Sequence, residues 1–591
     1  MPPPTVDERT PLNGAPSVNG SAANANRTSY GTDSSSQDAS PTPTLNEVEP
    51  PRPHGLKLAV IIGSLWVVLF MAALDGTIVV TLINSISSSF KASEKSGWLS
   101  TSYLLSVCAF SSIYGRLSDI IGRKGALLVA LSFFTAGTCL CALAATMDQL
   151  LVGRFVAGIG GGGILSSSSI IMSDVIPLRD RGLWQGITNI LFGTASAMGG
   201  PLGGFINDSY GWRVAFGSQV PFLVIGGACI ATFVNIPLPS TGQPLRKKLA
   251  RIDYLGSIML ISLSSCLLVA MNFLSGEGLP FSDVRVWGLL LGFAVFVGLF
   301  VLVEGKVVKE PIMPLWLLTR RTPGLVSASY FLGAGAHMAV IFHFPLWFQS
   351  VRLLSASKAG VHLIPISFSA AAGSLWAGLY MKRTGKYWRA NIICCLLNIV
   401  STGYGATWNE NTSVLAEYVT FMPQAFGTSA IFTFMLLAMI SSVRREDMAT
   451  ATGNVYLFRS LGSVVGVGLA SAIFQMILSS SLARNITPDL LPNPSDGWKG
   501  VHKLISDIRH DASLVPTLHP EPLRHAAQKA YMLGIKSIFA LITAVNVLYF
   551  LVCWPVQEVE LTNSNDPKPT SPQQPQTQDS EPDSQSSTAD A

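Results

Sequence analysis

The stretch GRLSDIIGRKG at residues 115–125 lies between two long apolar segments and carries three glycines, one aspartate and three cations. Glycine adopts backbone angles that strain other residues, so the stretch predicts a sharp turn between two antiparallel helices. Asp119 can accept hydrogen bonds at a helix N-terminus or pair with Arg123. If two halves of the molecule rock against each other, such a cluster can hold one state shut. The alternative is a tight, basic cytosolic turn that has no switching role.

The composition of the whole chain argues against the alternative of a large soluble protein with many buried helices. The chain has 591 residues, of which 49% are hydrophobic and only 12% are charged, whereas soluble domains have roughly a quarter charged residues. The apolar residues occur in runs of about 20, the length that crosses the hydrocarbon core of a bilayer. All eight cysteines lie inside apolar segments, which argues against a disulfide framework or a zinc site. The net charge of +5 gives no reason to expect nucleic acid, since the cations lie between the spans. The sequence therefore predicts an all-α polytopic membrane protein.

Fourteen apolar segments are long enough to be membrane helices, whereas a barrel strand would need only about ten residues. They cover approximately residues 58–86, 97–117, 125–146, 150–174, 183–206, 213–236, 253–274, 285–304, 323–349, 356–381, 388–408, 414–441, 450–479 and 531–554.

The cations of the connections predict the orientation. The even-numbered connections hold nineteen Lys and Arg residues, and the short odd-numbered ones hold six. Cytosolic loops carry the excess of such residues, so both termini are expected in the cytosol.

The two ends of the chain are predicted to be disordered. Residues 1–56 and 556–591 are rich in Ser, Pro, Asn, Thr and Gln, and such segments cannot bury enough apolar surface to fold. Because the polar N-terminal tail precedes the first span, no signal peptide is expected. A long non-cytosolic loop is expected at 480–530. Candidate glycosylation sites are Asn411 and Asn485, each in an Asn-x-Ser/Thr triplet of a non-cytosolic loop.

An internal repeat divides the chain. GLYMKRTGKYWR at 378–389 repeats the glycine spacing of the first turn 263 positions later. Asp180, Gly186 and Gly199 of RDRGLWQGITNILFGTASAMGG (179–200) recur as Asp447, Gly453 and Gly466 at an offset of 267. The near-equal offsets predict two related six-helix bundles, 57–236 and 323–555, joined by a linker at 237–322 that carries an inserted pair of helices. Parallel duplication of this kind is typical of transporters with a solute site between the halves.

These motifs resemble those of the major facilitator superfamily. GRLSDIIGRKG is similar to the family's loop 2–3 signature, G-x-L-x-D-x-x-G-R-[RK]. LDGTIVVTLINSI (74–86), LLVGRFVAGIGGGG (150–163) and GTASAMGGPLGGFI (193–206) resemble the first-, fourth- and fifth-helix motifs of its fourteen-span drug:proton antiporter branch. The resemblance covers about residues 57–555. It implies the major facilitator fold with fourteen helices and proton antiport.

Two charged residues inside spans are the predicted proton-coupling site, Asp75 and Arg154. A charged side chain deep in a span costs on the order of 2.5–3.5 kcal/mol on insertion scales and therefore needs a reason. The alternatives are an aspartate that only bonds a neighbouring helix, and an arginine that only snorkels. The run GIGGGG (158–163) lacks the Lys-Ser/Thr of a phosphate loop, so its glycines are expected to let helices approach closely.

Three further groups of candidates follow from the motifs. The predicted conformational gate consists of Gly115, Arg116, Asp119, Gly122, Arg123 and Lys124. The predicted fifth-helix antiporter motif, for which plain helix packing is the alternative, consists of Gly193, Gly199, Gly200, Pro201, Gly203 and Gly204. Polar and amphipathic residues that could line a solute cavity, with core packing as the alternative, are Trp347, Gln349, Gln424, Asn454, Tyr456 and Arg459.

No nucleotide-binding loop, metal cluster or nucleophile–base pair is present in the sequence, so neither an enzyme nor a cofactor nor a metal site is predicted, and an ion gradient is the expected energy source. The expected partners are protons, a small-molecule solute and the lipid bilayer; we expect a monomer and no nucleic acid.

The sequence indicates the transported solute less clearly than it indicates the transport mechanism. EPIMPLWLLTRRTP (310–323), MKRTGKY (381–387) and ATGNVYLFRSLGSVVGV (451–467) resemble the fungal vacuolar basic amino acid transporters, and DERTPL (7–12) resembles an acidic dileucine sorting signal in which Asn13 replaces the second apolar residue. The favoured hypothesis is export of basic amino acids from the cytosol into the vacuole in exchange for protons. The alternatives are a plasma-membrane pump for drugs, secondary metabolites or toxins, and a nutrient sensor that does not transport.

Overall fold

The computed structural model describes residues 55–90, 98–235, 253–275, 279, 282–308, 311–354, 356–444, 447–490, 497–510 and 512–558. Every regular element in these residues is helical, as the long apolar segments predict. The expected disorder of the tails and the sorting signal at 7–12 fall outside the described residues, apart from the few positions at 55–56 and 556–558.

The first group of helices surrounds α4. It consists of α1 (Leu56–Phe90), α2 (Trp98–Ile121), α3 (Arg123–Leu143), α4 (Met147–Val175), α5 (Leu178–Tyr210), α6 (Trp212–Gly217) and α7 (Val220–Phe233). α4 packs against α1, α2 and α3, while α1 also packs against α5 and α7. Apolar side chains fill the space between them, among them Leu65, Leu131 and Ile164.

The second group is arranged around α12 and α17. It consists of α12 (Arg321–Ser350), α13 (Ala356–Val361), α14 (Leu363–Thr384), α15 (Trp388–Ala406), α16 (Val414–Val419), α17 (Met422–Ser442), α18 (Met448–Asn485) and α20 (Glu521–Cys553). α12 packs against α17, α18 and α20, and α17 also packs against α14 and α15. Both groups belong to one compact unit, Pro51–Ala591.

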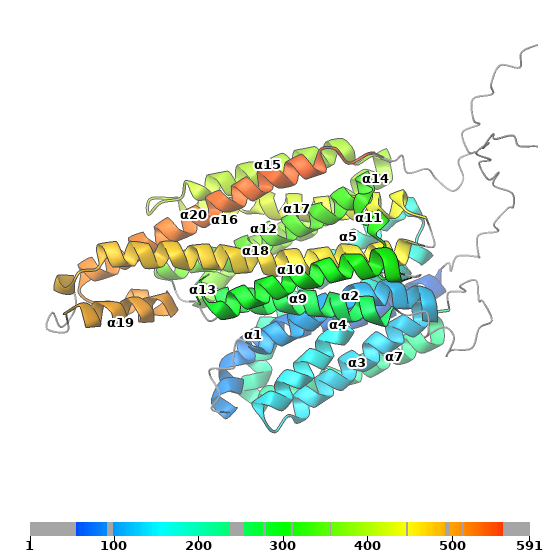
Figure 1. Cartoon of the computed structure of the whole chain (residues 1–591), viewed down its shortest axis with the longest axis horizontal. Helices are drawn as coiled ribbons and strands as arrows, with labels where there is room; N and C mark the ends of the chain where they lie inside the picture. Colours follow the sequence, from blue (N-terminus) through cyan, green and yellow to red (C-terminus); the bar gives the residue numbers. More distant parts are fainter. Residues whose placement is uncertain are drawn as a thin grey trace, which may run out of the picture. The chain divides into compact units, whose positions relative to one another are not determined.

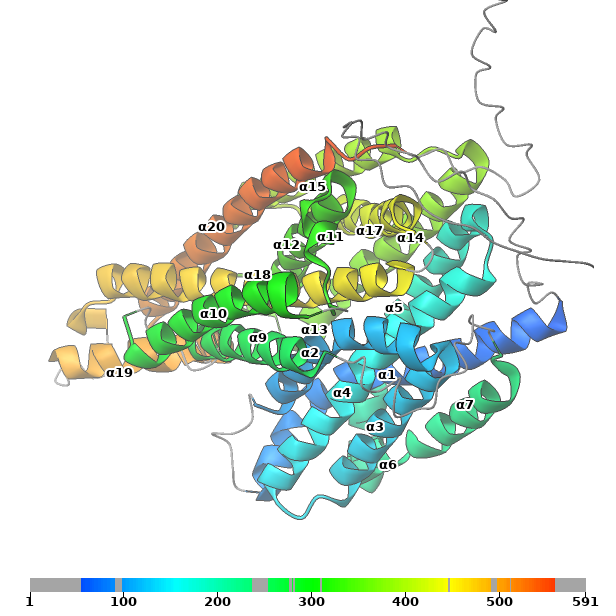
Figure 2. The same cartoon turned by 45° about the vertical axis from the view of Figure 1, so that its right-hand side comes forward.

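Two pairs of helices join the groups. α2 packs along α18, and α5 packs along α14. The expected inserted helices are α9 (Tyr254–Ser275) and α10 (Val284–Leu302), which is followed by a π-helical turn at Val303–Val307 and by the short α11 (Leu315–Thr319). α9 packs against α10 and also contacts both α2 and α18; Figures 1 and 2 show the two helices beside α18. The inserted pair therefore covers the line along which α2 meets α18.

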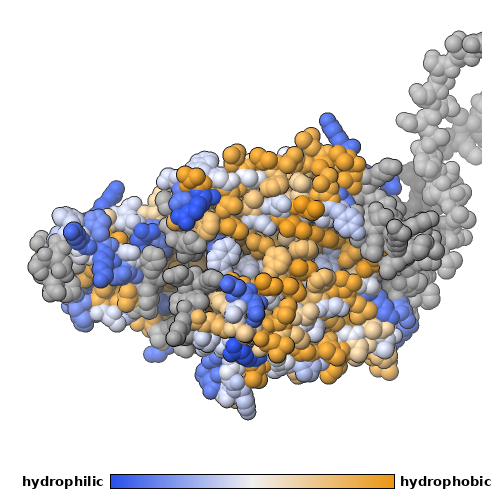
Figure 3. Space-filling view, turned by 60° about the horizontal axis from the view of Figure 1, so that its bottom comes forward, coloured by the Kyte–Doolittle hydropathy of each residue, from blue (hydrophilic) through white to orange (hydrophobic). Residues whose placement is uncertain are grey.

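The membrane spans agree with the predicted segments in position. Twelve helical segments of the described residues are long and apolar enough to cross a bilayer. Long helices, α5 and α15, also occupy the two remaining predicted spans, but they are not among these twelve. The count of fourteen spans thus stays a prediction. On the face drawn in Figure 3, hydrophobic residues cover the middle and hydrophilic residues gather toward the ends, as the bilayer requires.

Three connections differ from the simplest expectation. The turn between the second and third spans is a single residue, Gly122, between α2 and α3. The sixth span is broken at Ser218 and Gln219 into α6 and α7, just before Pro221, which lacks a backbone N–H. The loop expected at 480–530 contains helix α19 (Gly497–His510), whose Val501 and Ile508 are buried in the core of the second group.

Candidate functional site

The two predicted proton-coupling residues form a buried ion pair. Arg154 of α4 lies 2.7 Å from Asp75 of α1, measured from Nη1 to Oδ2, and the two side chains are 1% and 0% exposed. An ion pair without water gains full Coulomb attraction but has lost its hydration. Removing one partner of such a pair typically costs about 3–5 kcal/mol, because a buried charge is left uncompensated.

The pair is held by α2 and by the break between α6 and α7. The Arg154 Nε donates to the Leu99 carbonyl at 3.4 Å, and its guanidinium lies 4.3 Å from the centre of the Tyr103 ring. Gln219, which the sequence analysis did not single out, places its Nε2 at 3.5 Å from Asp75 Oδ1. Pro221 explains why the chain turns there, but no local pattern in the sequence connects Gln219 to the first span.

The glycine run of α4 makes this packing possible. A Cβ on Gly161 would lie 2.6 Å from the Tyr103 hydroxyl, and one on Gly162 would lie 2.6 Å from the Val107 carbonyl oxygen of α2. Both distances are too short for a side chain. The glycines therefore serve close helix approach, as predicted, and bring α2 against the arginine that Tyr103 covers.

The gate motif is organised by Arg123. Its Nη1 lies 2.6 Å from Asp119 and its Nε lies 2.8 Å from Asp174 of α4. It also donates to the Ser118 hydroxyl at 3.1 Å. Asp174, which the sequence analysis missed, stands 51 residues from its partner at the end of an apolar span. Gly122 has φ 96°, a conformation that favours glycine, so the turn between α2 and α3 can be one residue long.

The end of α2 that carries this motif, called the motif end below, contacts the start of α18. The Thr450 hydroxyl donates to Asp119 Oδ2 at 3.1 Å, and the Ser112 hydroxyl donates to Asn454 Oδ1 at 2.7 Å. A Cβ on Gly115 would lie 2.7 Å from the Ala449 carbonyl oxygen. Asn454, a predicted cavity residue, is thereby fully buried between α2 and α18.

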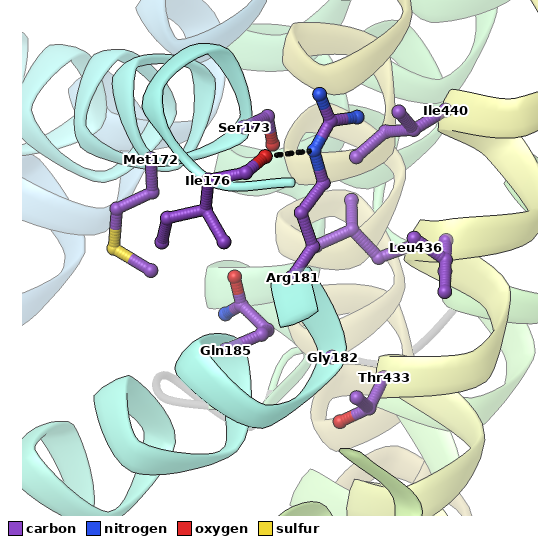
Figure 4. A pocket seen from close by; sticks show the side chains of 10 residues that line it. Met172, Ser173, Ile176, Arg181, Gly182, Gln185, Thr433, Leu436 and Ile440 are labelled. Atoms are coloured by element: carbon purple, nitrogen blue, oxygen red, sulfur yellow. Dashed lines mark hydrogen bonds between the residues drawn. The ribbon is translucent and has the colours of Figure 1, made fainter. Parts of the chain in front are cut away.

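α5 and α14 meet at the same end. Asn189 Nδ2 donates to the Ser374 hydroxyl at 2.6 Å, and Lys382 lies 2.9 Å from Asp180. Next to this contact lies a small pocket between α4, α5 and α17 (Figure 4). Arg181 spans it and donates to the Ile176 carbonyl at 3.0 Å. The two groups of helices are therefore closed against each other at the motif end.

Two other members of the gate motif face different neighbours. Lys124 bonds Asn235 at 3.2 Å. Arg116 lines a pocket together with Glu304 of the π-helical turn and Asp447, so the predicted gate also borders the inserted helices.

The fifth-helix motif packs against α1 through two of its glycines. A Cβ on Gly199 would lie 2.9 Å from Thr77 Cβ and 3.0 Å from the Ile78 backbone nitrogen. A Cβ on Gly203 would lie 2.6 Å from Ile78 Cγ1. Only a residue without a side chain fits at these two positions.

The remaining members of this motif lie in open surroundings. A Cβ on Gly193 or Gly204 would meet no atom within 4 Å, and one on Gly200 would meet only Thr81 Cγ2 at 3.6 Å. Pro201 is exposed in the interior of α5, where proline removes one helix hydrogen bond.

Trp347 and Gln349 of α12 differ in their surroundings. Trp347 is fully buried in an aromatic cluster, 5.3 Å from Trp408 between ring centres, and its Nε1 donates to Glu417 at 3.3 Å. Glu417 in turn lies 2.5 Å from Arg352. Gln349 is half-buried. The surroundings of Trp347 are those of a core residue. The sequence analysis overlooked Glu417.

Three predicted cavity residues share one region between α12, α17 and α18. Gln424 Nε2 lies 3.4 Å from His337 Nδ1, and the Arg459 guanidinium lies 5.2 Å from the centre of the Phe432 ring. Arg459 and Tyr456 are half-buried. Gln424 contacts His337, and Arg459 interacts electrostatically with the same histidine.

A second buried acidic pair was not predicted. Asp253 Oδ2 and Glu304 Oε1 both lie within 3.0 Å of the position that a Cβ on Gly256 would take, so they are at most 6 Å apart. Glu304 Oε1 accepts from the backbone N–H groups of Ile312 and Met313 at 3.2 and 3.4 Å. Asp253 directly precedes α9, and Glu304 lies just after the end of α10. Because the two residues belong to different spans, the hydropathy of each span gives no indication that they are neighbours.

The two candidate glycosylation sites are both exposed. Asn411 lies in the turn between α15 and α16, and Asn485 is the last residue of α18, where its Nδ2 bonds the Ser481 carbonyl at 2.8 Å.

Comparison with known proteins identifies the family. The family model of the Major Facilitator Superfamily matches residues 65–467. The chain is 36% identical over 509 residues to the Multidrug resistance protein fnx1 of Schizosaccharomyces pombe, covering 86% of this chain and 94% of that protein. It is 33% identical over 456 residues to the Vacuolar basic amino acid transporter 1 of Saccharomyces cerevisiae, covering 71% and 79%.

A solved structure supports the fold. The proton:xylose symporter XylE, bound to 6-bromo-6-deoxy-D-glucose, superposes with a TM-score of 0.53 at 14% identity, over 85% of this chain and 97% of that one. The helices, their motifs and these relatives agree: the chain is an integral multi-pass membrane protein and a transporter of the major facilitator superfamily.

Proposed function

We propose that this protein is a proton-coupled antiporter that moves small organic solutes by alternating access, with Asp75 as the group that binds and releases the proton. The observation that carries the proposal is the buried ion pair between Asp75 and Arg154, 2.7 Å apart between α1 and α4. An ionisable side chain inside a membrane costs free energy, and such residues often belong to proton relays.

The conformation described here is one of the two that alternating access requires. Its motif end is closed by the bonds Thr450–Asp119, Ser112–Asn454 and Asn189–Ser374. The excess of cations in the even-numbered connections supports a cytosolic location of this end and of both termini. Opening toward the cytosol then requires that these three hydrogen bonds separate.

α2 can connect the proton site to the closed end. One end of this helix holds Arg154 through the Leu99 carbonyl and the Tyr103 ring, and the other end carries Ser112 and Asp119 against α18. Protonation of Asp75 removes the charge that Arg154 pairs with, so the guanidinium keeps its contacts with α2 and with the Phe216 ring of α6. Because α2 contacts both the Asp75–Arg154 pair and the motif end, a shift at the ion pair can move the motif end as well, with α2 acting as one rigid element.

We favour basic amino acids as the solutes and the vacuolar membrane as the location. This choice rests on the relative whose printed name is Vacuolar basic amino acid transporter 1 and on the stretches at 310–323, 381–387 and 451–467. Efflux of drugs or secondary metabolites across the plasma membrane is the second candidate, supported by the relative named Multidrug resistance protein fnx1.

Uptake into sealed vesicles tests the function. Proteoliposomes with an acidic lumen are supplied with lysine, arginine, histidine or a panel of hydrophobic cationic drugs, with and without a protonophore. The proposal expects accumulation of the basic amino acids that the protonophore abolishes. Accumulation of the drugs alone would favour the second candidate. Binding without movement of any solute would indicate a sensor and contradict the proposal.

A further inference from the structure

Arg459 lies at a position along α18 that corresponds to the expected middle of the membrane. It is the twelfth residue of α18, which begins at Met448 at the motif end, so it stands about 16 Å along the helix at 1.5 Å per residue. Half of a ~30 Å hydrocarbon core is about the same distance. Its neighbour Phe432 stands at a similar depth in α17, ten residues after Met422.

Other arginines in or beside the spans have a carboxylate partner, whereas Arg459 has none in the described residues. Arg154 pairs with Asp75, Arg123 pairs with two aspartates, and Arg352, at the end of α12, pairs with Glu417. Within the described part of the chain, Arg459 forms no ion pair, and its guanidinium lies over the Phe432 ring at 5.2 Å. A charged group at the bilayer centre is normally paired with another charge or with backbone carbonyls. The side chain is half-buried and can therefore still receive a partner from solution.

The surroundings of Arg459 offer further polar groups. His337 of α12 interacts electrostatically with it and lies 3.4 Å from Gln424 of α17. When His337 Nδ1 accepts from Gln424, the ring carries its proton on Nε2 and can donate it to a ligand. Gln424 Oε1 is buried and accepts no hydrogen bond within the described residues. A buried amide oxygen of this kind requires a donor.

These groups are complementary to an α-amino acid. A guanidinium binds a carboxylate through two parallel hydrogen bonds, and an amide oxygen accepts from an ammonium group. Phe432 stacks on Tyr330 with ring centres 4.8 Å apart, which fixes the aromatic surface beneath the guanidinium. The acceptor, the donor and the charge come from three helices, α12, α17 and α18, of the second group.

We propose that Arg459 binds the carboxylate of the transported amino acid and that Gln424 Oε1 accepts from its α-ammonium group. This inference rests on the proposed transport of amino acids and adds which end of the solute is bound. The substrate class follows from it: solutes with a free α-carboxylate, whatever their side chain, in preference to amines that lack the carboxylate.

The test compares three cationic probes that differ at the carboxylate: L-lysine, L-lysinamide and cadaverine. Their uptake is measured in proteoliposomes of the wild-type protein and of Arg459→Gln and Arg459→Lys. The wild-type protein is expected to prefer lysine over lysinamide by about ten- to a hundredfold in kcat/KM, the range of a charge-assisted hydrogen bond. In Arg459→Gln this ratio should fall to about one, mainly through KM. Arg459→Lys, which keeps the charge without the planar fork, should give an intermediate ratio.

Arg320→Gln is the matched control. Arg320 also lies over an aromatic ring, that of Trp316 at 4.6 Å, but it is exposed at the start of α12. This variant should keep the wild-type ratio. A wild-type protein that does not discriminate lysine from lysinamide, or an Arg459→Gln variant that discriminates as well as the wild type, would overturn the inference.

A binding measurement separates this inference from the proposed function. The thermal unfolding of the purified protein in detergent is followed with each probe added, which needs no proton gradient. Stabilisation by lysine but not by lysinamide, lost in Arg459→Gln, would support the carboxylate site even if no proton-driven uptake is found. Stabilisation by neither probe, or by both equally in the wild-type protein, would overturn it even if proton-driven transport is demonstrated.

Discussion

Asp119 of α2 accepts a hydrogen bond from Thr450 of α18 at 3.1 Å, while its other oxygen holds Arg123 at 2.6 Å. One carboxylate therefore joins the signature turn of the first group of helices to the first turn of α18 in the second. The turn at residues 115–125 is thus part of the contact that closes the motif end, in addition to connecting two spans.

Removing this bond should weaken the closed state. In Thr450→Val the hydroxyl is lost while the side chain keeps its volume, and a hydrogen bond to a charged group contributes about 1.5–3 kcal/mol net. We expect alkylation of a reporter cysteine placed at Thr433, which lines the pocket at this end, to become about ten- to a hundredfold faster. Thr452→Val is the control, because Thr452 bonds the Met448 carbonyl of its own helix at 2.8 Å. Equal alkylation rates in both variants would show that the bond to Asp119 does not hold the end closed.

Two of the carboxylate–cation contacts at the motif end, Asp174–Arg123 and Asp180–Lys382, should contribute differently to stability. Asp174 is 9% exposed beside the buried Arg123, whereas Asp180 and Lys382 are 34% and 47% exposed. Asp174→Asn is expected to destabilise the protein by about 1.5–3 kcal/mol, the range for a bond to a charged group. Asp180→Asn should change stability by less than about 1 kcal/mol, since solvent and salt screen the exposed pair. Thermal unfolding in detergent measures both variants; a larger loss in Asp180→Asn would contradict the burial argument.

The glycines of the fifth-helix motif should separate into two classes. At Gly199 a Cβ would lie 3.0 Å from the backbone nitrogen of Ile78, whereas at Gly204 it would meet no atom within 4 Å. Gly199→Ala should therefore lower both the unfolding temperature and the transport rate, because α5 must move away from α1. Gly204→Ala should be neutral or stabilising by up to about 1 kcal/mol from helix propensity. Uptake and thermal unfolding on the two variants check this, and equal effects would mean that contact with α1 is not what these positions require.

The sequence predicted the helices and the motif turn because each depends on local composition or spacing; the insertion of α9 and α10 between two repeated bundles stays a prediction. Long apolar runs can only be spans, and glycines around Asp119 require a turn. Asp75 and Arg154 pair across 79 residues, a contact that charge alone did not specify, and their role in proton coupling stays a prediction.

The sequence did not reveal partners that depend on how distant helices pack. Asp174 reaches Arg123 only because α3 and α4 lie side by side, and Gln219 reaches Asp75 only because the sixth span is broken. Trp347 was a candidate cavity residue with core packing as the alternative, and Glu417 and Trp408 from other helices bury it as core packing requires. Hydropathy cannot tell an inward-facing tryptophan of the core from one that faces a solute.

The central claim, that Asp75 couples proton movement to solute movement, is tested by comparing two fluxes in one preparation. Asp75→Asn, Asp75→Glu and the double variant Asp75→Asn/Arg154→Gln are reconstituted, and lysine–lysine exchange is measured beside accumulation driven by a pH gradient. The double variant removes both buried charges, which avoids leaving Arg154 unpaired. We predict that the two variants without the carboxylate still exchange lysine but lose all accumulation driven by the gradient, whereas Asp75→Glu retains it. Gradient-driven accumulation at the wild-type level in the double variant would contradict the account.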